Sequence, residues 1–176
     1  MNLRAFATEI NALLDAESRS LMEHAHELTP YVSAKTYRTW QAIQEFYQRD
    51  TDHAGRLTAI LQAIGAPERP RPFSQAVGHY HFITIEKLLA LLIEEKTRQV
   101  AAYDRAIKHA GNEEAVKTEL TGLREDNISE LARLQVMLQG LMVGTGGLLD
   151  PNHSPDLNNA ANVVEARKAL EKAKAK

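Results

Sequence analysis

The chain has 176 residues, no cysteine, a formal net charge of -2 and a hydrophobic content of 44%. This length and composition fit one globular domain that buries its own core without disulfides. The absence of cysteine excludes thiolate catalysis, iron–sulfur clusters and cysteine zinc sites, so any metal must be held by oxygen and imidazole ligands. The small net charge gives no global attraction to nucleic acid or to anionic membranes.

Targeting and nucleotide-binding signals are also missing. The N-terminal sequence MNLRAFATEI has no uninterrupted apolar run, so it does not predict a secretory signal. The longest apolar stretch, LLALLI, is far too short to cross a bilayer. Neither a P-loop nor a dinucleotide-binding glycine pattern is present. We therefore expect a cytoplasmic protein without a membrane partner.

Apolar residues recur at spacings of three and four throughout the chain, which predicts an all-α fold. The first helix is predicted from about residue 3 to residue 28, because Pro30 cannot continue it. Its apolar stripe consists of Phe6, Ile10, Leu13, Leu21 and Leu28. The second helix is predicted to begin after an N-cap at Ser33 and to end at Gly65. Its stripe consists of Ile43, Tyr47, Leu57, Leu61 and Ile64.

A segment with three prolines and two glycines, GAPERPRPFSQAVGHYHF, follows the second helix. Its roughly 17 residues reach over about 50 Å when fully extended, which is enough to run along a helical bundle. The third helix is predicted over residues 83–109 and the fourth over residues 113–142, with a tight connection between them. Connections in the order short, long, short predict a four-helix bundle in which a long crossover joins two antiparallel helix pairs.

The bundle is expected to comprise residues 1–145, and residues 146–176 to form an irregular tail with a short basic C-terminal helix. The last twelve residues hold five cations and two acids. This modest excess indicates a solvated helix end more than a nucleic-acid contact. We expect the partner of the protein to be a second copy of itself, giving a dimer.

The stretch QRDTDHAGRL places Asp50 and His53 three residues apart, on one face of the second helix. A shift of 77 positions lays RLTAILQAIG of this helix on RLQVMLQGLM of the fourth. The same shift aligns three pairs of polar residues: Asp50 with Asn127, His53 with Glu130, and Glu17 with Glu94. Polar residues thus fall on polar residues at positions along the apolar stripes, which indicates a repeated site.

The chain resembles the ferritin-like superfamily, particularly its bacterioferritin and rubrerythrin branches, over about residues 3–142. The resemblance rests on Glu17, on an acid-x-x-His 33 residues later, on the long crossover and on the second polar helix pair. It implies two metal ions held by one Glu from each of two helices and a Glu-x-x-His from each of the other two. It also implies iron or manganese, with metal oxidation or reactions of peroxide or oxygen as the activity.

Two departures from the family pattern make the predicted site asymmetric. Asp50 stands where the family has Glu, and Asn127-x-x-Glu130 stands where it has Glu-x-x-His, so one nitrogen ligand is missing. The remaining oxygen-rich set favours manganese and predicts a site filled at one position or only in part. The candidate metal ligands are Glu17, Asp50, His53, Glu94 or Glu95, Asn127 and Glu130.

Two residues compete to be the ligand from the third helix. The 77-residue shift selects Glu94, whereas the apolar stripe of this helix points Glu95 inward. The stripe consists of Ile85, Leu88, Leu92, Ala102 and Ala106. Lys96 and Arg98 nearby offer partners that would neutralise a buried acid without any metal.

Two hypotheses about function follow from these patterns. In the first, the protein is a ferritin-like bundle that binds iron or manganese, with Tyr47 and Tyr103 as redox-active neighbours of the metal. In the second, the bundle holds no metal, its core keeps a polar hydrogen-bonded layer, and it serves as a structural or stress-related interaction module. The tyrosines are then core residues with satisfied hydroxyl groups.

Overall fold

The computed structural model describes residues 2–24, 30–69 and 82–142. Within these ranges every regular element is a helix, and the only extended pairing is an isolated bridge between Tyr31 and Thr84. The helices are α1 (Leu3–Ser18), α2 (Leu21–His24), α3 (Tyr37–Ala63), α4 (Ile85–His109) and α5 (Glu114–Met142). None of them combines the length and the apolar character that a membrane span requires. The all-α prediction is confirmed, and the predicted tail over residues 146–176 lies outside the described residues.

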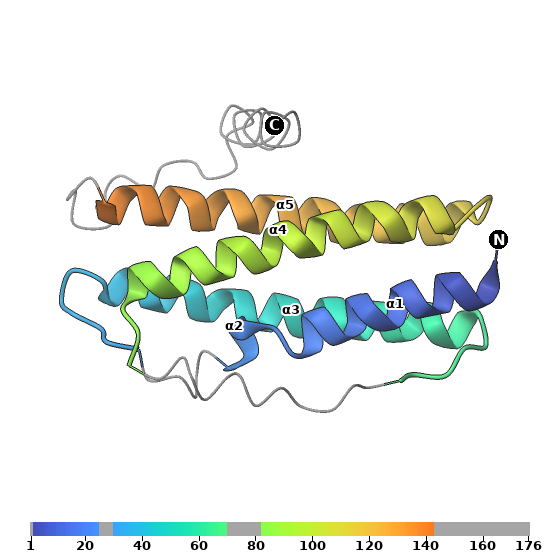
Figure 1. The fold of residues 1–176 in the computed structure, drawn as a ribbon, viewed down its shortest axis with the longest axis horizontal. Helices are drawn as coiled ribbons and strands as arrows, with labels where there is room; N and C mark the ends of the chain where they lie inside the picture. Colours follow the sequence, from blue (N-terminus) through green and yellow to red (C-terminus); the bar gives the residue numbers. More distant parts are fainter. Residues whose placement is uncertain (1, 25–29, 70–81, 143–176) are drawn as a thin grey trace.

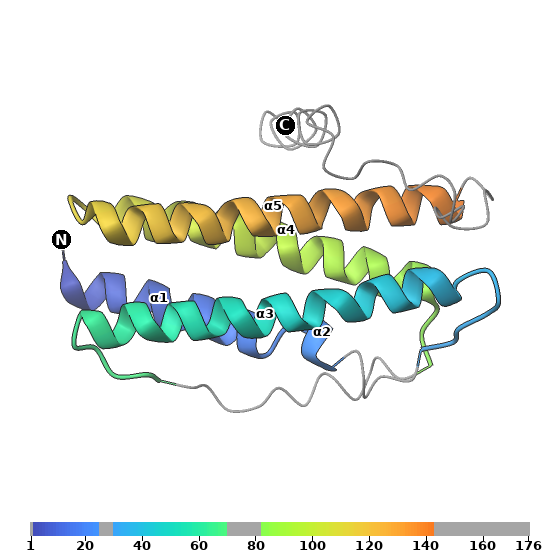
Figure 2. The same ribbon diagram turned by 180° about the vertical axis from the view of Figure 1, so that it is seen from behind.

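The four long helices lie side by side as a bundle (Figure 1, Figure 2). α1 packs on α3 and α4, and α4 packs on α5, whereas α3 and α5 contact each other least among the neighbouring long helices. α3 and α4 both begin at the end of the bundle drawn at the left of Figure 1, and α1 and α5 begin at the opposite end. Each long helix therefore runs antiparallel to both of its neighbours.

Local sequence sets most of the helix ends. Asn2 and Thr84 are N-caps, because each side-chain oxygen accepts a hydrogen bond from the backbone N–H three residues later, at 3.2 and 3.3 Å. α3 ends at Ala63, and Gly65 then adopts a φ of 66°, the left-handed conformation that commonly closes a helix. The predicted end of the second helix at Gly65 is confirmed.

The start of α3 differs from the prediction. The N-cap is Thr36 and not Ser33. The backbone N–H of Ser33 donates to Oγ1 of Thr36 at 2.9 Å, and the backbone N–H of Thr36 donates to the carbonyl of Ser33 at 3.1 Å. Ser33 therefore forms a turn that precedes the helix.

The prediction of one continuous helix over residues 3–28 is wrong, because the chain leaves the helical conformation at Arg19, with φ of -138° and ψ of 30°. In an unbroken helix the backbone N–H of Leu21 would donate to the carbonyl of Glu17. It donates to the carboxylate of Glu95 in α4, at 2.9 and 3.2 Å. A tertiary contact thus replaces the helical hydrogen bond at this point.

The apolar core consists of two clusters. The first lies where α1 begins and contains Phe6, Ile10, Leu13, Leu57, Ile60, Leu61, Tyr103, Ala106, Ala110, Leu120 and Leu123. The second lies where α3 and α4 begin and contains Met22, Ala42, Ile43, Phe46, Ile85, Leu88, Leu89, Leu92, Leu134 and Met137. Each fully buried Leu, Ile or Phe contributes about 1.5–3 kcal/mol, so these clusters supply the packing stability of the bundle.

A buried polar layer separates the two clusters. It consists of Glu17, Asp50, His53, Lys96, Gln99, Asn127 and Glu130, each at most 3% exposed. Burying a charged group costs several kcal/mol unless the charge is paired. The polar layer therefore reduces stability relative to apolar packing unless its charges neutralise one another or bind a cation.

Candidate metal centre

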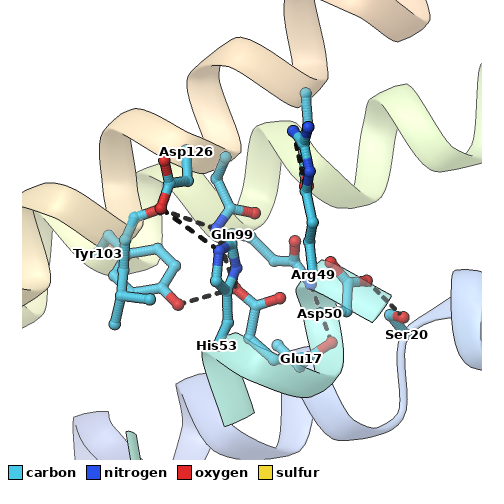
Figure 3. Close-up of polar contacts among 12 residues, drawn as sticks. Glu17, Ser20, Arg49, Asp50, His53, Gln99, Tyr103 and Asp126 are labelled. Atoms are coloured by element: carbon cyan, nitrogen blue, oxygen red, sulfur yellow. Dashed lines mark hydrogen bonds and ion pairs between the residues drawn. The ribbon is translucent and has the colours of Figure 1, made fainter. Parts of the chain in front are cut away.

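Three candidate ligands from α1 and α3 meet in the polar layer (Figure 3). Glu17 lies on the last turn of α1, and Asp50 and His53 lie one turn apart in the middle of α3, on the same face. One ligand atom of each residue lies within 4.8 Å of the other two, and all three side chains are buried. Two carboxylates and one imidazole are therefore close enough to contact one cation. We call Glu17, Asp50 and His53 the ligand group.

The ammonium group of Lys96 lies at the centre of the remaining charges. Its Nζ is 2.5 Å from Oδ1 of Asp50, 2.8 Å from Oε2 of Glu130 and 3.7 Å from Oε2 of Glu17. It also donates to Oδ1 of Asn127 at 3.0 Å. Burial alone would lower the pKa of Lys96, but the three carboxylates raise it well above its ordinary value. Lys96 is therefore a permanent internal cation.

Neither candidate acid of the third predicted helix reaches the ligand group. Glu94 is exposed and pairs with Arg98 at 2.8 Å, one turn along α4. Glu95 is half-buried and accepts the hydrogen bond from the backbone N–H of Leu21. Lys96, and neither of these carboxylates, contacts Asp50 and Glu17. Metal binding by Glu94 or Glu95 stays a prediction.

Asn127 and Glu130 of α5 lie in the polar layer, at the positions that the repeat predicted. Nδ2 of Asn127 donates to Oε1 of Glu17 at 2.9 Å and to a backbone carbonyl of α5 at 3.0 Å. Both amide hydrogens of Asn127 are thus used. Glu130 contacts Lys96 and lies 3.9 Å from the guanidinium of Arg49. Whether either residue binds metal stays a prediction.

Glu17 is held by several donors. Its Oε1 accepts hydrogen bonds from the hydroxyl of Tyr103 at 2.7 Å and from Asn127 at 2.9 Å. Burial raises the pKa of Glu17, but contact with His53, the charge of Lys96 and the Tyr103 hydroxyl lower it from 4.5 to about 2. Its other oxygen, Oε2, accepts no hydrogen bond from the described residues. Glu17 is therefore an anion whose Oε2 has no hydrogen-bond donor in the described part of the chain and lies 3.7 Å from the ammonium group of Lys96.

Asp50 shows the opposite electrostatic behaviour. Its Oδ2 accepts a hydrogen bond from the buried hydroxyl of Ser20 at 2.8 Å, and its Oδ1 accepts one from Lys96 at 2.5 Å. Burial raises the pKa of Asp50 to about 7 despite the charge of Lys96, and the charges of Glu17 and Glu130 add to the rise. Asp50 therefore titrates near neutral pH in the metal-free protein.

His53 has one ring nitrogen facing inward and one facing outward (Figure 3). Nδ1 lies 3.6 Å from Oε1 of Glu17 and 3.4 Å from Nδ2 of Asn127, which has no hydrogen left to donate to it. Nε2 lies 3.6 Å from Oδ2 of Asp126. Burial alone would lower the pKa of His53, but Glu17 and Glu130 raise it above 6.5.

The charges of Glu17, Asp50, Glu130 and Lys96 sum to minus two, and the half-exposed guanidinium of Arg49, 3.9 Å from Glu130, offsets part of this. Glu17, Asp50 and Glu130 carry three negative charges, and Lys96 carries one positive charge. A divalent ion beside a neutral His53 would bring the sum to zero. A proton on Asp50 together with a proton on His53 would do the same. One divalent ion, or protons on Asp50 and His53, would therefore offset the negative charge of these residues.

The sequence did not predict that Lys96 lies at the centre of the site. It indicated only that Lys96 could pair with a buried acid. A signal for its position exists, because Lys96 lies four residues after Leu92 and seven before Tyr103, both of which are buried.

The hydroxyl of Tyr103, one of the two candidate tyrosines, donates a hydrogen bond to Glu17. Tyr47, the other candidate tyrosine, is partly buried against the second apolar cluster.

Comparisons with protein-family models, with curated proteins and with solved structures found no match to this chain. The resemblance to the ferritin-like superfamily therefore stays a prediction from the sequence. Function has to be argued from the geometry of the polar layer.

Proposed function

We propose that the protein binds one divalent metal ion, iron or manganese, through Glu17, Asp50 and His53. The observation that carries this proposal is the gathering of three ligand atoms within 4.8 Å in a buried layer. Oε2 of Glu17, which accepts no hydrogen bond from the described residues, supports it further. Carboxylate oxygens suit manganese and imidazole suits iron, so this mixed set is compatible with both metals.

The donor set fits one ion and not the pair that the family resemblance implies. The ligands of a second ion would come from α4 and α5, where Nζ of Lys96 lies 2.8 Å from Glu130 and 3.0 Å from Asn127. A second metal ion there would meet the positive charge of the ammonium group at contact distance. The ammonium group also lies 2.5 Å from Oδ1 of Asp50, so the first ion has to displace it from that carboxylate while it keeps its contacts with Glu130 and Asn127. We infer that Lys96 takes the place of the second ion.

Iron or manganese bound there would supply redox chemistry, such as oxidation of the metal or reactions with peroxide or oxygen. The chain itself holds the ligands in place: Glu17 and Asp50 each accept two hydrogen bonds from buried donors. Such outer contacts orient metal ligands and are needed for affinity. The apolar clusters on both sides keep bulk water away from the ligand group.

We also infer a long crossover of the ferritin-like type between α3 and α4. Its support is that α3 ends at one end of the bundle and α4 begins at the other (Figure 1). Residues 64–84 therefore have to connect opposite ends of the bundle. Such a crossover would join two antiparallel pairs, α1 with α3 and α4 with α5, and each pair contributes residues to the polar layer.

A metal-free bundle is the second candidate, and the contacts of Lys96 are the observation that favours it. The ammonium group already neutralises part of the charge on Asp50 and Glu130, and protons on Asp50 and His53 would complete the balance. The protein would then be a structural or stress-related interaction module, acting as a dimer. Its polar layer would fix the register of the helices.

Metal binding by matched variants separates the two candidates. Wild type, His53→Ala and Glu94→Gln are titrated with Mn²⁺ and Fe²⁺ under anaerobic conditions, after circular dichroism has shown that each is folded. Metal binding predicts equal affinity for wild type and Glu94→Gln, because Glu94 is exposed, and an affinity lower by about 10–100-fold or more for His53→Ala. Negligible binding by all three proteins would support the metal-free bundle.

A further inference from the structure

One residue of the ligand group contacts an exposed side chain. Glu17 and Asp50 have only buried partners among the described residues. His53 differs, because its Nε2 lies 3.6 Å from Oδ2 of Asp126, a side chain that is 53% exposed (Figure 3). The contact between Asp126 and His53 is therefore the most direct link between solvent and the ligand group.

This contact lies between α3 and α5, the neighbouring helices that contact each other least. Gly122 of α5 lies one turn before Asp126 and has no side chain to fill the space. A Cβ at Gly122 would lie 3.4 Å from Nη2 of Arg56, so the guanidinium of Arg56 covers this position. The charged side chain of Arg56, and not a packed apolar one, therefore covers the bundle here.

Arg56 competes directly for the oxygen that faces His53. Its guanidinium pairs with Glu119 at 2.5 Å and with Oδ2 of Asp126 at 3.4 Å, reaching from α3 to α5. These three side chains are 38–53% exposed, and exposed ion pairs contribute little to stability. Arg56 can therefore leave Asp126 at a small cost in free energy.

The spacing between Asp126 and His53 suits a shared ion. Bonds from a metal to an imidazole nitrogen or a carboxylate oxygen are about 2.0–2.2 Å long. Two such atoms 3.6 Å apart can contact the same ion. An ion held between them lies next to the ring whose other nitrogen faces Glu17.

We propose that Asp126 is the loading residue of the metal centre. It captures a hydrated divalent ion between α3 and α5 and passes it to Nε2 of His53, and a turn of the imidazole ring then brings the ion to the side of Glu17. Arg56 slows the capture by occupying Oδ2 of Asp126. This inference rests on the proposed function. Since Asp126 lies outside the ligand group, it changes the rates of metal entry and exit by the same factor and leaves the equilibrium affinity nearly unchanged.

The test compares Asp126→Asn and Arg56→Gln with a matched pair of control variants, Asp104→Asn and Arg124→Gln. Asp104 and Arg124 pair at 2.6 Å between α4 and α5, so the controls make the same changes of charge at another helix interface. Uptake of Mn²⁺ is followed by stopped-flow mixing with a fluorescent Mn²⁺ indicator. Release is followed after addition of excess chelator, and the dissociation constant is measured by equilibrium titration.

We expect Asp126→Asn to slow both uptake and release by about tenfold relative to Asp104→Asn. Arg56→Gln is expected to accelerate both steps relative to Arg124→Gln. Equal rates for Asp126→Asn and Asp104→Asn, in a protein that binds Mn²⁺, would overturn the loading role alone. A lower affinity with an unchanged uptake rate would also overturn it, because Asp126 would then be an equilibrium ligand. Wild type that takes up no Mn²⁺ would overturn the proposed function as well.

Discussion

The two halves of the polar layer come from corresponding helix pairs but carry different chemistry. α1 and α3 supply the ligand group, with two carboxylates and an imidazole within 4.8 Å. α4 and α5 supply Lys96, Asn127 and Glu130, with the ammonium group of Lys96 at the centre. The comparison teaches that two helix pairs with polar residues at the same height can differ in charge, because a buried lysine stands in one pair and two carboxylates with an imidazole stand in the other.

Replacement of Lys96 tests the half of the polar layer that comes from α4 and α5. It has the largest expected effect on the free energy of unfolding. Lys96→Met would leave the buried carboxylates of Asp50 and Glu130 without their cation, and removing one partner of a buried ion pair costs about 3–5 kcal/mol. We expect a loss of this size in the free energy of unfolding, measured by urea denaturation of the metal-free protein at neutral pH.

Lys87→Met is the matched control, because Lys87 is an exposed lysine of the same helix. We expect it to change the free energy of unfolding by less than about 0.5 kcal/mol. Similar small losses for the two variants would show that the carboxylates do not depend on the charge of Lys96.

Asp50 connects the two halves and makes stability depend on pH. Its pKa is raised from 3.8 to about 7, so its proton binds more tightly in the folded state than in the unfolded state. The resulting stabilisation is fully present below pH 3.8 and is lost as the pH rises through about 7. The raised pKa of His53 acts in the same direction, from about pH 6.5 upward. The lowered pKa of Glu17 acts oppositely, but only as the pH falls from 4.5 towards 2.

We therefore expect the free energy of unfolding of the metal-free protein to fall between mildly acidic and mildly alkaline pH. The slope is at most about 1.4 kcal/mol per pH unit for each proton released. Asp50→Asn removes its share of this slope, whereas Asp52→Asn, an exposed change on the same helix, leaves it in place. Urea denaturation at a series of pH values measures the slope, and a wild-type stability that rises over this range would contradict the account.

Tyr103→Phe is expected to lower the free energy of unfolding less than Lys96→Met does, through the half of the polar layer that contains Glu17. It removes the hydroxyl that donates to Oε1 of Glu17 at 2.7 Å while Asn127 still donates to the same oxygen. Hydrogen bonds to charged groups contribute about 1.5–3 kcal/mol, and we expect a loss near the lower limit in the free energy of unfolding. Tyr37→Phe, at an exposed tyrosine, is the control. Equal effects of the two variants would mean that the Tyr103 hydroxyl does not support Glu17.

Glu94→Gln is expected to have the smallest effect. Glu94 and Arg98 are 64% and 69% exposed, and exposed pairs one helical turn apart contribute about 0.3–0.5 kcal/mol. We expect a change of this size in urea denaturation and an unchanged affinity for Mn²⁺. A weaker affinity for Mn²⁺ would place Glu94 inside the site, as the 77-residue repeat predicts.

Helical periodicity predicted much of the bundle and one half of the site. α4 and α5 begin and end within two residues of the predicted bounds, because both carry apolar stripes between clear turn signals. The spacing from Glu17 to Asp50 and His53 placed three polar residues at one height of the bundle, where the structure has them. Asn127 and Glu130 followed from the repeat in the same way.

The break after α1 and the role of Lys96 depend on contacts that local sequence does not encode. No proline or glycine marks Arg19 and Ser20, and the break is accompanied by contacts to Asp50 and Glu95, which lie 30 and 74 residues from their partners. Lysine is rarely buried, so its side chain is predicted on the surface by default. Only the combined charge of three carboxylates from α1, α3 and α5 explains its place.

The number of Mn²⁺ ions bound per chain at saturation tests the central claim most directly. Equilibrium dialysis gives the number, and electron paramagnetic resonance of the same sample distinguishes an isolated ion from a coupled pair. We predict one ion per chain with the spectrum of isolated Mn²⁺, because the ammonium group of Lys96 contacts Glu130 and Asn127, the residues expected to hold a second ion. Two coupled ions per chain, or none, would contradict the account.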